Sequence, residues 1–220
     1  MSAEKTDSGS QTLSRGLTAL ELISQSDAPL SVSELGAQLG IHRSMAYRLV
    51  KTLEQHGFIE RDAAGGLSLG AKLSTLARGV AKTLQEAAAP ELTSLAAKLE
   101  MTAFLATLDG DEVVTLSSAE PPNAETTVAK RPGSRHSIDR GAPGKVVRSQ
   151  LHPSTYPPAP FEVSQDEVIP GVASIAVPVV VPGSKPAALA VVFLPQQVDT
   201  DKIADALTAA ARRIVTAAGA

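Results

Sequence analysis

The chain has 220 residues, enough for two domains of ordinary size, since typical domains hold roughly 100–150 residues. A hydrophobic fraction of 43% and a charged fraction of 20% exclude an intrinsically disordered chain, and the absence of cysteine excludes disulfides and thiolate metal sites. The net charge of -3 excludes a uniformly basic coat for nucleic acid, so nucleic-acid binding would need a local basic patch. No apolar run reaches the ~20 residues of a membrane helix, and no signal peptide is recognised. We therefore expect a cytoplasmic protein with no membrane partner.

The first predicted elements are helices with clear start and stop signals. Residues 1–12 are polar and are expected to be a disordered tail, and apolar residues at helical spacing over 13–23 predict a first helix. Ser31 and Glu34 have the spacing of a capping box, which predicts the start of a short second helix. Gly40 suits the left-handed cap at the end of that helix, so a tight turn is expected there.

A third helix and a hairpin follow the turn. Apolar residues recur at helical spacing over 46–53, and Gly57 ends this pattern with the chemistry of a C-terminal cap. Two short strands, 58–61 and 67–69, flank a glycine-containing turn at 63–66 and predict a hairpin. Three helices followed by such a hairpin are typical of a winged helix-turn-helix.

The rest of the chain predicts a second, α+β domain. We expect a winged helix-turn-helix over 13–70, a linker helix over 71–89 that Pro90 interrupts, and the second domain over 90–220. Asp109-Gly110 predicts a hairpin turn. Strands are expected at 102–108, 112–118, 126–130, 172–181 and 187–194. Helices are expected to restart at Pro90 and run to Leu99, and to cover 144–151 and 201–218. The proline-rich residues 152–160 are expected to hold no regular element.

In a helix-turn-helix, the second helix of the motif lies in the major groove with its N-terminal residues toward the base edges. Arginine donates two hydrogen bonds to guanine or contacts phosphate, methionine contacts a thymine methyl group, and an arginine near the wing meets the DNA backbone or minor groove. The expected DNA-binding residues are His42, Arg43, Ser44, Met45, Tyr47, Arg48, Lys51 and Arg61. The alternative is a small packing unit whose arginines are only solvated.

Five segments of the first domain resemble the IclR family of transcriptional regulators. They are Ser14-Arg15-Gly16-Leu17, Leu30-Ser31-Val32-Ser33-Glu34-Leu35, Arg43-Ser44-Met45-Ala46-Tyr47-Arg48-Leu49, His56-Gly57-Phe58-Ile59-Glu60-Arg61 and Leu69-Gly70. Farther along, residues 108–114, Gly144-Lys145, Asp166-Glu167 and residues 170–178 are similar to that family's effector-binding domain. The resemblance implies a GAF-like sensor fold, a homodimer or tetramer, operator DNA as a partner, and control by a small organic acid.

The resemblance also implies which residues line an effector pocket. They are Ala142, Pro143, Ser164, Ser174, Val191 and Phe193. The stretch between Gly144-Lys145 and Asp166 is shorter than is usual in the family, and Val191 and Phe193 stand where small polar residues are common. A ligand with a larger apolar portion is therefore expected, if one binds.

A basic cluster lies within the second domain, made of Lys130, Arg131, Arg135, His136, Arg140 and Lys145. One of these residues could neutralise a ligand carboxylate, or the cluster could lie against DNA or a partner subunit. The remaining alternative is a solvated charged loop.

Two other functions are alternatives to a ligand-responsive regulator. His42, His56, His136 and His152 have no metal-binding spacing, and no phosphate-binding loop or nucleophile elbow is present, so we expect neither an enzyme nor a cofactor. The second rival is a DNA-binding regulator whose second domain only oligomerises and binds no effector.

Overall fold

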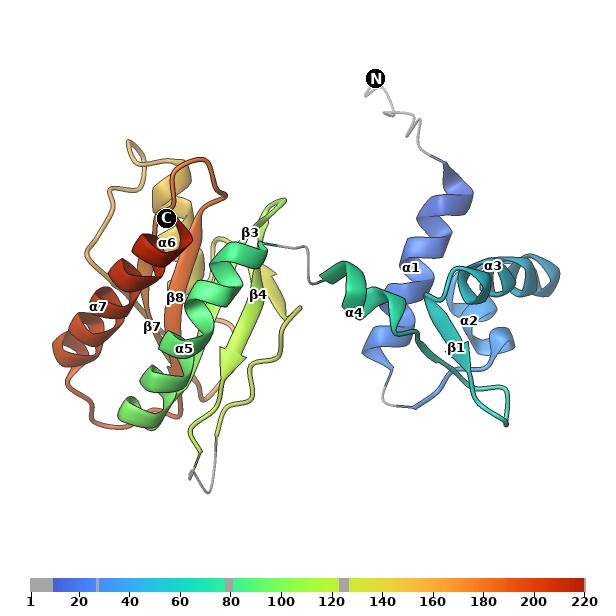
Figure 1. Ribbon diagram of the computed structural model, residues 1–220, viewed down its shortest axis with the longest axis horizontal. Helices are drawn as coiled ribbons and strands as arrows, with labels where there is room; N and C mark the ends of the chain where they lie inside the picture. Colours follow the sequence, from blue (N-terminus) through green and yellow to red (C-terminus); the bar gives the residue numbers. More distant parts are fainter. Residues whose placement is uncertain (1–9, 27, 78–80, 123–126, 220) are drawn as a thin grey trace. The chain divides into compact units, whose positions relative to one another are not determined.

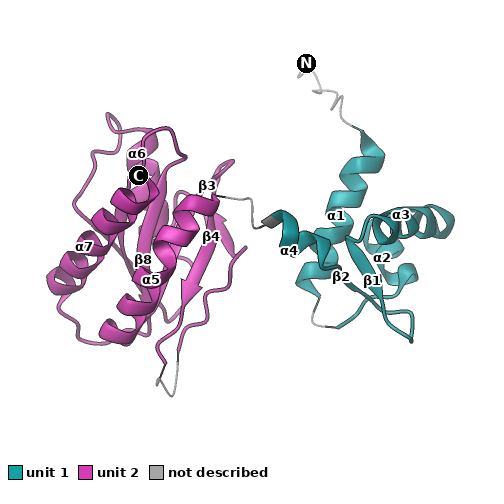
Figure 2. Ribbon diagram, in the orientation of Figure 1, with its two compact units in different colours: residues 1–80 teal, residues 81–220 magenta. Residues whose placement is uncertain are grey.

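The computed structural model describes residues 10–26, 28–77, 81–122 and 127–219 (Figure 1). Contacts between residues divide the chain into two compact units, 1–80 and 81–220 (Figure 2). Both units mix helices with antiparallel strands, which confirms the predicted α+β class. The domain limits given above stay a prediction.

The first unit contains three helices, a hairpin and a short fourth helix. Its elements are α1 (Gln11–Gln25), α2 (Val32–Gln38), α3 (Arg43–Gln55), β1 (Ile59–Arg61), β2 (Leu67–Leu69) and α4 (Lys72–Ala77). The helices enclose a small core with β1 and β2. Its buried residues are Ala19, Ile23, Val32, Leu35, Ala46, Leu49, Val50, Ile59 and Leu67.

The helix ends have the predicted chemistry. The Ser31 hydroxyl accepts a hydrogen bond from the backbone of Glu34, and the Glu34 carboxylate accepts one from the backbone of Ser31, so the capping box of α2 is confirmed. At the end of α3, the Phe58 amide donates to the Leu53 carbonyl at 2.9 Å, and Gly57 has a φ of 72°. This is the hydrogen bond of a Schellman motif, and it sets the direction in which the chain leaves α3.

The wing is a two-stranded hairpin attached to the helices. The Leu67 amide donates to the Leu30 carbonyl at 2.8 Å, so the segment before α2 pairs with the hairpin. Gly70 follows β2 where a Cβ atom would stand 2.2 Å from the Gly57 carbonyl oxygen. Only glycine fits this close approach of two backbones.

The second unit is a six-stranded antiparallel sheet with helices on both faces. Its elements are α5 (Lys82–Leu99), β3 (Thr102–Asp109), β4 (Glu112–Ala119), β5 (Arg135–Ser137), α6 (Gly141–Leu151), β6 (Glu162–Gln165), β7 (Ala173–Val179), β8 (Ala187–Phe193) and α7 (Thr200–Ala218). The strand order is β5-β4-β3-β8-β7-β6. The predicted hairpin at Asp109-Gly110 joins β3 to β4.

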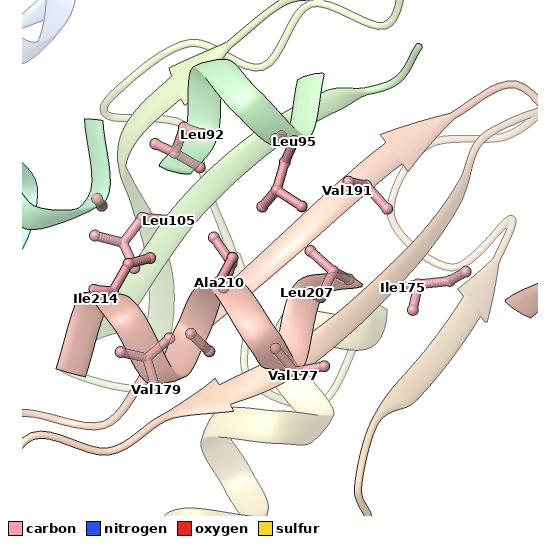
Figure 3. Packing of buried hydrophobic residues seen from close by; sticks show 14 of the residues in the cluster. Leu92, Leu95, Leu105, Ile175, Val177, Val179, Val191, Leu207, Ala210 and Ile214 are labelled. Carbon is pink, nitrogen blue, oxygen red and sulfur yellow. The ribbon is translucent and has the colours of Figure 1, made fainter. Parts of the chain in front are cut away.

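The two faces of the sheet carry separate cores. Leu105 of β3 and Val191 of β8 pack against α5 and α7 (Figure 3). Phe104 and Val192, the neighbours of these residues in sequence, face the opposite side together with the buried residues of α6. Because side chains alternate along a strand, each residue of β8 belongs to one core or the other.

Three expectations about elements were wrong. Helix α5 continues through Pro90, which is exposed, because Leu84 and Leu92 on either side of it are both buried against the sheet. Residues 127–130 form no strand, and residue 126 lies outside the described residues. Strands β5 and β6 were not expected, because segments of three and four residues give little periodicity.

Three further observations bear on the expectations. Residues 152–160 hold no regular element, as predicted. Val80 of the expected linker helix lies outside the described residues. Within the described residues, no helix is both long and apolar enough to cross a membrane.

Candidate nucleic-acid interface and ligand hollow

Helix α3 has one buried face and one free face. Ala46, Leu49 and Val50 are buried, and α2 approaches so closely that a Cβ atom on Gly36 would lie 3.0 Å from that of Ala46. Gly40, with a φ of 62°, forms the turn between the two helices. The free face and the residue preceding it carry the expected DNA-binding residues of this region, all of them exposed: His42, Arg43, Ser44, Met45, Tyr47, Arg48 and Lys51.

The first residues of the free face cap the helix. The His42 ring accepts a hydrogen bond through Nδ1 from the Ser44 amide at 3.4 Å, and the same nitrogen lies 3.0 Å from the Ser44 hydroxyl oxygen. These contacts fix both side chains at the N-terminus of α3, where backbone amides and the helix dipole favour an anion such as phosphate.

Arg43 and Tyr47 form a pair one turn apart on the free face. The Arg43 guanidinium donates to the Tyr47 hydroxyl at 3.3 Å and lies 5.5 Å from the ring centroid. The same hydrogen bond lowers the pKa of Tyr47. Arg48 and Lys51 form no ion pair within the described residues, so both cations remain available for an anionic partner.

Arg15 was not expected at this surface. It comes from α1, and its Nη1 donates to the Met45 sulfur at 3.3 Å, which holds the thioether at the N-terminal end of α3. In the sequence, Arg15 was notable only as part of the segment Ser14-Arg15-Gly16-Leu17, one of the five that resemble a known family. Periodicity within α1 gives no information about contact with another helix.

The wing carries one of the expected residues, and that residue is already paired. Arg61 donates through Nε to the Glu54 carboxylate at 2.9 Å and through Nη2 at 3.4 Å, and the first of these bonds raises the pKa of Arg61. This pair ties β1 to α3. The hairpin loop is ordered by Asp62, whose carboxylate accepts from the amides of Ala64 at 2.9 Å and Gly66 at 2.8 Å.

A small hollow lies in the second unit, on the α6 face of the sheet. Its volume is about 40 Å³, and Pro143, Ser164 and Ser174 are among its lining residues. The Ala142 amide donates to the Ser164 hydroxyl at 2.9 Å. The Ser174 hydroxyl donates to the Val191 carbonyl at 2.9 Å. Three of the residues expected at an effector pocket therefore line this hollow, and the backbones of two others, Ala142 and Val191, are hydrogen-bonded to its serines.

The side chains of the other two expected pocket residues lie on the other face of the sheet. Val191 and Phe193 both belong to the core between the sheet and helices α5 and α7, where Figure 3 shows Val191. Val192, between them, lines the hollow instead. Placing residues on a strand from a family resemblance requires the strand register, and a shift of one residue exchanges the two faces.

The basic cluster separates into residues with different surroundings. Arg135 forms ion pairs with Asp109 and Glu112, and Lys145 forms one with Glu167. Arg131 and Arg140 are exposed and form no ion pair within the described part of the chain.

The remaining two members of the cluster, Lys130 and His136, line the hollow. The Lys130 ammonium lies 5.4 Å from the centroid of the Phe104 ring and has no ion-pair partner among the described residues. Burial lowers the pKa of Lys130 and is also the main cause of the lowered pKa of His136. The described residues contain no cluster of side chains that could hold a metal ion.

Comparisons with known proteins agree with this arrangement. Residues 12–63 match the model of the IclR helix-turn-helix domain. An HTH-type transcriptional regulator of Mycobacterium tuberculosis is 30% identical over 157 residues, which cover 70% of this chain and 60% of that protein. The match thus spans less than two thirds of that relative's length.

Solved structures share the fold at lower identity. An IclR transcriptional regulator from Alicyclobacillus acidocaldarius is 22% identical, with a TM-score of 0.83 over 96% of this chain and 100% of that one. An IclR homologue from Microbacterium hydrocarbonoxydans, solved with 4-hydroxybenzoate, is 22% identical, with a TM-score of 0.79 over 94% and 98% of the two chains.

Proposed function

The chain belongs to the IclR family, and from this premise we propose that it is a transcriptional regulator that binds operator DNA through α3. The observation that carries the proposal is the exposed face of α3, where Arg43, Arg48 and Lys51 lie outside the core of the first unit. The match of residues 12–63 to a DNA-binding domain of this family supports it. Operator DNA as the partner places the protein in the cytoplasm.

The chemistry of the free face assigns a role to each side chain. Arg43 and Arg48 donate to guanine edges, Tyr47 and Met45 contact neighbouring bases, and Lys51 meets phosphate. His42 and Ser44, at the N-terminus of α3, hold a phosphate group. Arg61 contacts the DNA backbone with the donors that its pair with Glu54 leaves free.

The regulator is proposed to act as a homodimer or tetramer. Leu13 and Leu17 of α1 are 63% and 54% exposed, which supports a second copy of the chain packing against this helix. A two-fold dimer presents two copies of α3 to a roughly palindromic site, whose half-sites lie about 10 base pairs apart, or a multiple of that spacing.

The second unit is proposed to sense an organic acid at the hollow. Lys130 supplies a positive charge without an ion-pair partner among the described residues, beside the ring of Phe104. The described lining also contains His136, Glu167, two serines and apolar side chains. Because the Glu167 carboxylate is paired with Lys145, Lys130 remains the cation for a carboxylate attached to an apolar body. A homologue solved with 4-hydroxybenzoate supports a ligand of this class.

One observation favours the alternative that this unit only oligomerises. The hollow of about 40 Å³ has room for only about three water molecules, far less than the roughly 300–1,000 Å³ of ordinary ligand sites. Val191 and Phe193, which would have lined a larger pocket, are part of the opposite core.

DNA binding is tested by gel shift of the full-length protein with the DNA upstream of its own gene. Wild type should bind this DNA better than random DNA, and Arg43→Ala/Arg48→Ala should lose the preference. Arg131→Ala/Arg212→Ala is the matched control, because both of these exposed arginines lie in the second unit. Equal binding by wild type and the Arg43→Ala/Arg48→Ala variant would contradict the assignment of α3.

Ligand sensing is tested by thermal shift with 4-hydroxybenzoate. At 100 times its dissociation constant, a ligand stabilises its binding domain by ~2.7 kcal/mol. The shift should be lost in Lys130→Met and kept in Arg131→Met, which removes an exposed charge next to it in sequence. If neither 4-hydroxybenzoate nor a wider panel of organic acids shifts wild type, the oligomerisation alternative is favoured.

A further inference from the structure

A hollow between α1 and α3 reaches the free face of α3. Its volume is about 420 Å³, and Arg15 of α1 lines it together with Met45 and Arg48 of α3. Met45 and Arg48 are two of the residues proposed to contact bases. Hydroxyl-bearing and apolar residues make up the rest of the described lining, which contains no acidic residue. Arg15 therefore lies beside the DNA-reading residues, although it belongs to another helix.

The guanidinium of Arg15 is directed to a single acceptor. Its Nη1 donates to the Met45 Sδ at 3.3 Å. Within the described residues Arg15 forms no ion pair, so no carboxylate competes with the sulfur for this guanidinium. A thioether is a weak acceptor, and the positive charge of the donor strengthens the bond. The contact therefore holds the sulfur without neutralising the charge of Arg15.

Met45 needs a contact of this kind to keep one conformation. It is the third residue of α3 and is 45% exposed, so core packing does not fix its side chain. The unbranched side chain of methionine has three rotatable bonds. Fixing the sulfur determines the first two of these torsions and leaves only the terminal methyl group free to rotate. Arg15 thus restricts Met45 before any partner binds, which reduces the entropy that binding would cost.

Packing of α1 on α3 fixes the position of Arg15 in turn. Arg15 is partly buried, and a Cβ atom at its neighbour Gly16 would lie 3.5 Å from the side chain of Leu49. Ala19, one turn after Arg15, is completely buried in the core of the first unit. Arg15 is therefore held on a helix that is packed against α3, and contacts between packed helices are more precise than contacts from loops.

We propose that Arg15 is a positioning residue for DNA reading, which holds Met45 in the conformation that contacts the methyl group of a thymine. This inference rests on the proposed binding of operator DNA by α3. It adds a residue of α1 that determines sequence specificity through Met45. Because Arg15 acts through one base-reading side chain, its loss changes the preference at one base pair of each half-site and leaves the rest of the sequence preference in place.

The test uses the DNA duplex that the full-length protein selects from a random library, with single thymines replaced by uracil, which lacks only the methyl group. Fluorescence anisotropy gives the ratio of the two affinities. Wild type should prefer thymine about fourfold at one position of each half-site, the effect of burying one methyl-sized group. Met45→Ala should bring this ratio close to one. Arg15→Ala should do the same, because ordering a free methionine costs about as much as the methyl contact contributes.

Two further variants separate positioning from loss of charge. Lys72→Ala removes one positive charge from an exposed residue of the same unit that lies outside the hollow, and should keep the ratio. Met45→Leu retains an apolar side chain of similar size without the sulfur, so adding Arg15→Ala to it should not change the ratio further. Each ratio compares two duplexes with the same protein sample, so a smaller folded fraction cancels from it.

Each other outcome overturns a defined statement. A thymine preference that Met45→Ala abolishes and Arg15→Ala retains would reject positioning by Arg15. Equal weakening of both duplexes by Arg15→Ala would show a contact with phosphate instead and would reject it as well. The absence of any thymine preference in wild type would reject this inference and leave the selected motif, and with it the proposed function, in place. Failure of wild type to select any duplex would reject the proposed function itself.

Discussion

At the scale of single residues, burial of basic groups gives the second unit a specific response to pH. His136 lines the small hollow, and its pKa is lowered from 6.5 mainly by burial, with a further contribution from the charge of Lys130. Because the unfolded chain binds this proton more readily, the stability that His136 contributes is complete above pH 6.5. It is lost as the pH falls through the folded-state pKa.

We therefore expect the free energy of unfolding to fall between about pH 8 and pH 5 in wild type and to fall less in His136→Gln. Urea denaturation at several pH values in this range measures both slopes. Glu91, Asp109 and Glu167 do not interfere, because their pKa values are lowered from ordinary values that already lie below this range. Equal slopes for the two proteins would contradict the burial of His136.

Two glycines of the first unit should respond to alanine with opposite signs. A Cβ atom at Gly70 would overlap the Gly57 carbonyl, whereas one at Gly16, inside α1, would make an ordinary 3.5 Å contact with Leu49. Gly70→Ala should destabilise the unit by ~1–3 kcal/mol, and Gly16→Ala should stabilise it by roughly 0.5–1 kcal/mol. Hydrogen exchange of the α3 amides in the full chain measures both changes. A gain in Gly70→Ala would show that the two backbones do not approach as described.

Caps and tight turns were the residue-level features that the sequence predicted best. The bonds at Ser31 and Phe58 join residues three to five positions apart, so spacing alone identifies them. The pair of Arg61 with Glu54 and the contact of Arg15 with Met45 join different elements, and no local pattern contains them.

At the scale of elements, α2 depends on its cap because it has only 7 residues. Ser31→Ala removes the hydroxyl that accepts from the Glu34 amide and should lower the stability of the helix by about 1 kcal/mol. Hydrogen exchange of the α2 amides measures this loss. Ser33→Ala, at an exposed position of the same helix, is the control and should cost nothing. Equal effects of the two substitutions would contradict the capping role of Ser31.

Long elements were predicted well, and so were the short strands of the wing, which flank a glycine-containing turn, whereas the short strands β5 and β6 were not. Strands β7 and β8 stand out as apolar runs because residues on both faces of the sheet are buried. Such a run does not reveal which residue faces which core. Val191 and Phe193, expected at the pocket from the family resemblance, have their side chains in the core that packs against α5 and α7. Pro90 is a local signal for a helix end that tertiary packing overrides.

At the scale of the whole molecule, the net charge of -3 and a DNA-binding role are compatible. The binding energy would come from a few cations on α3, while acidic residues elsewhere balance them. Arg43, Arg48 and Lys51 lie on the free face of one helix, which the helical period predicts, so this part of the candidate site follows from sequence alone. The position of the small hollow does not, because its lining depends on strand register and on residues 127–130, which have no regular structure.

The central claim is that two copies of α3 read a specific DNA sequence. Selection of bound duplexes from a random library by the full-length protein tests it most directly. The expected result is an enriched motif with two inverted half-sites, whose centres lie about 10 base pairs or a multiple of that apart, and its loss in Arg43→Ala/Arg48→Ala. No enrichment with wild type, or the same motif with the variant, would contradict the claim.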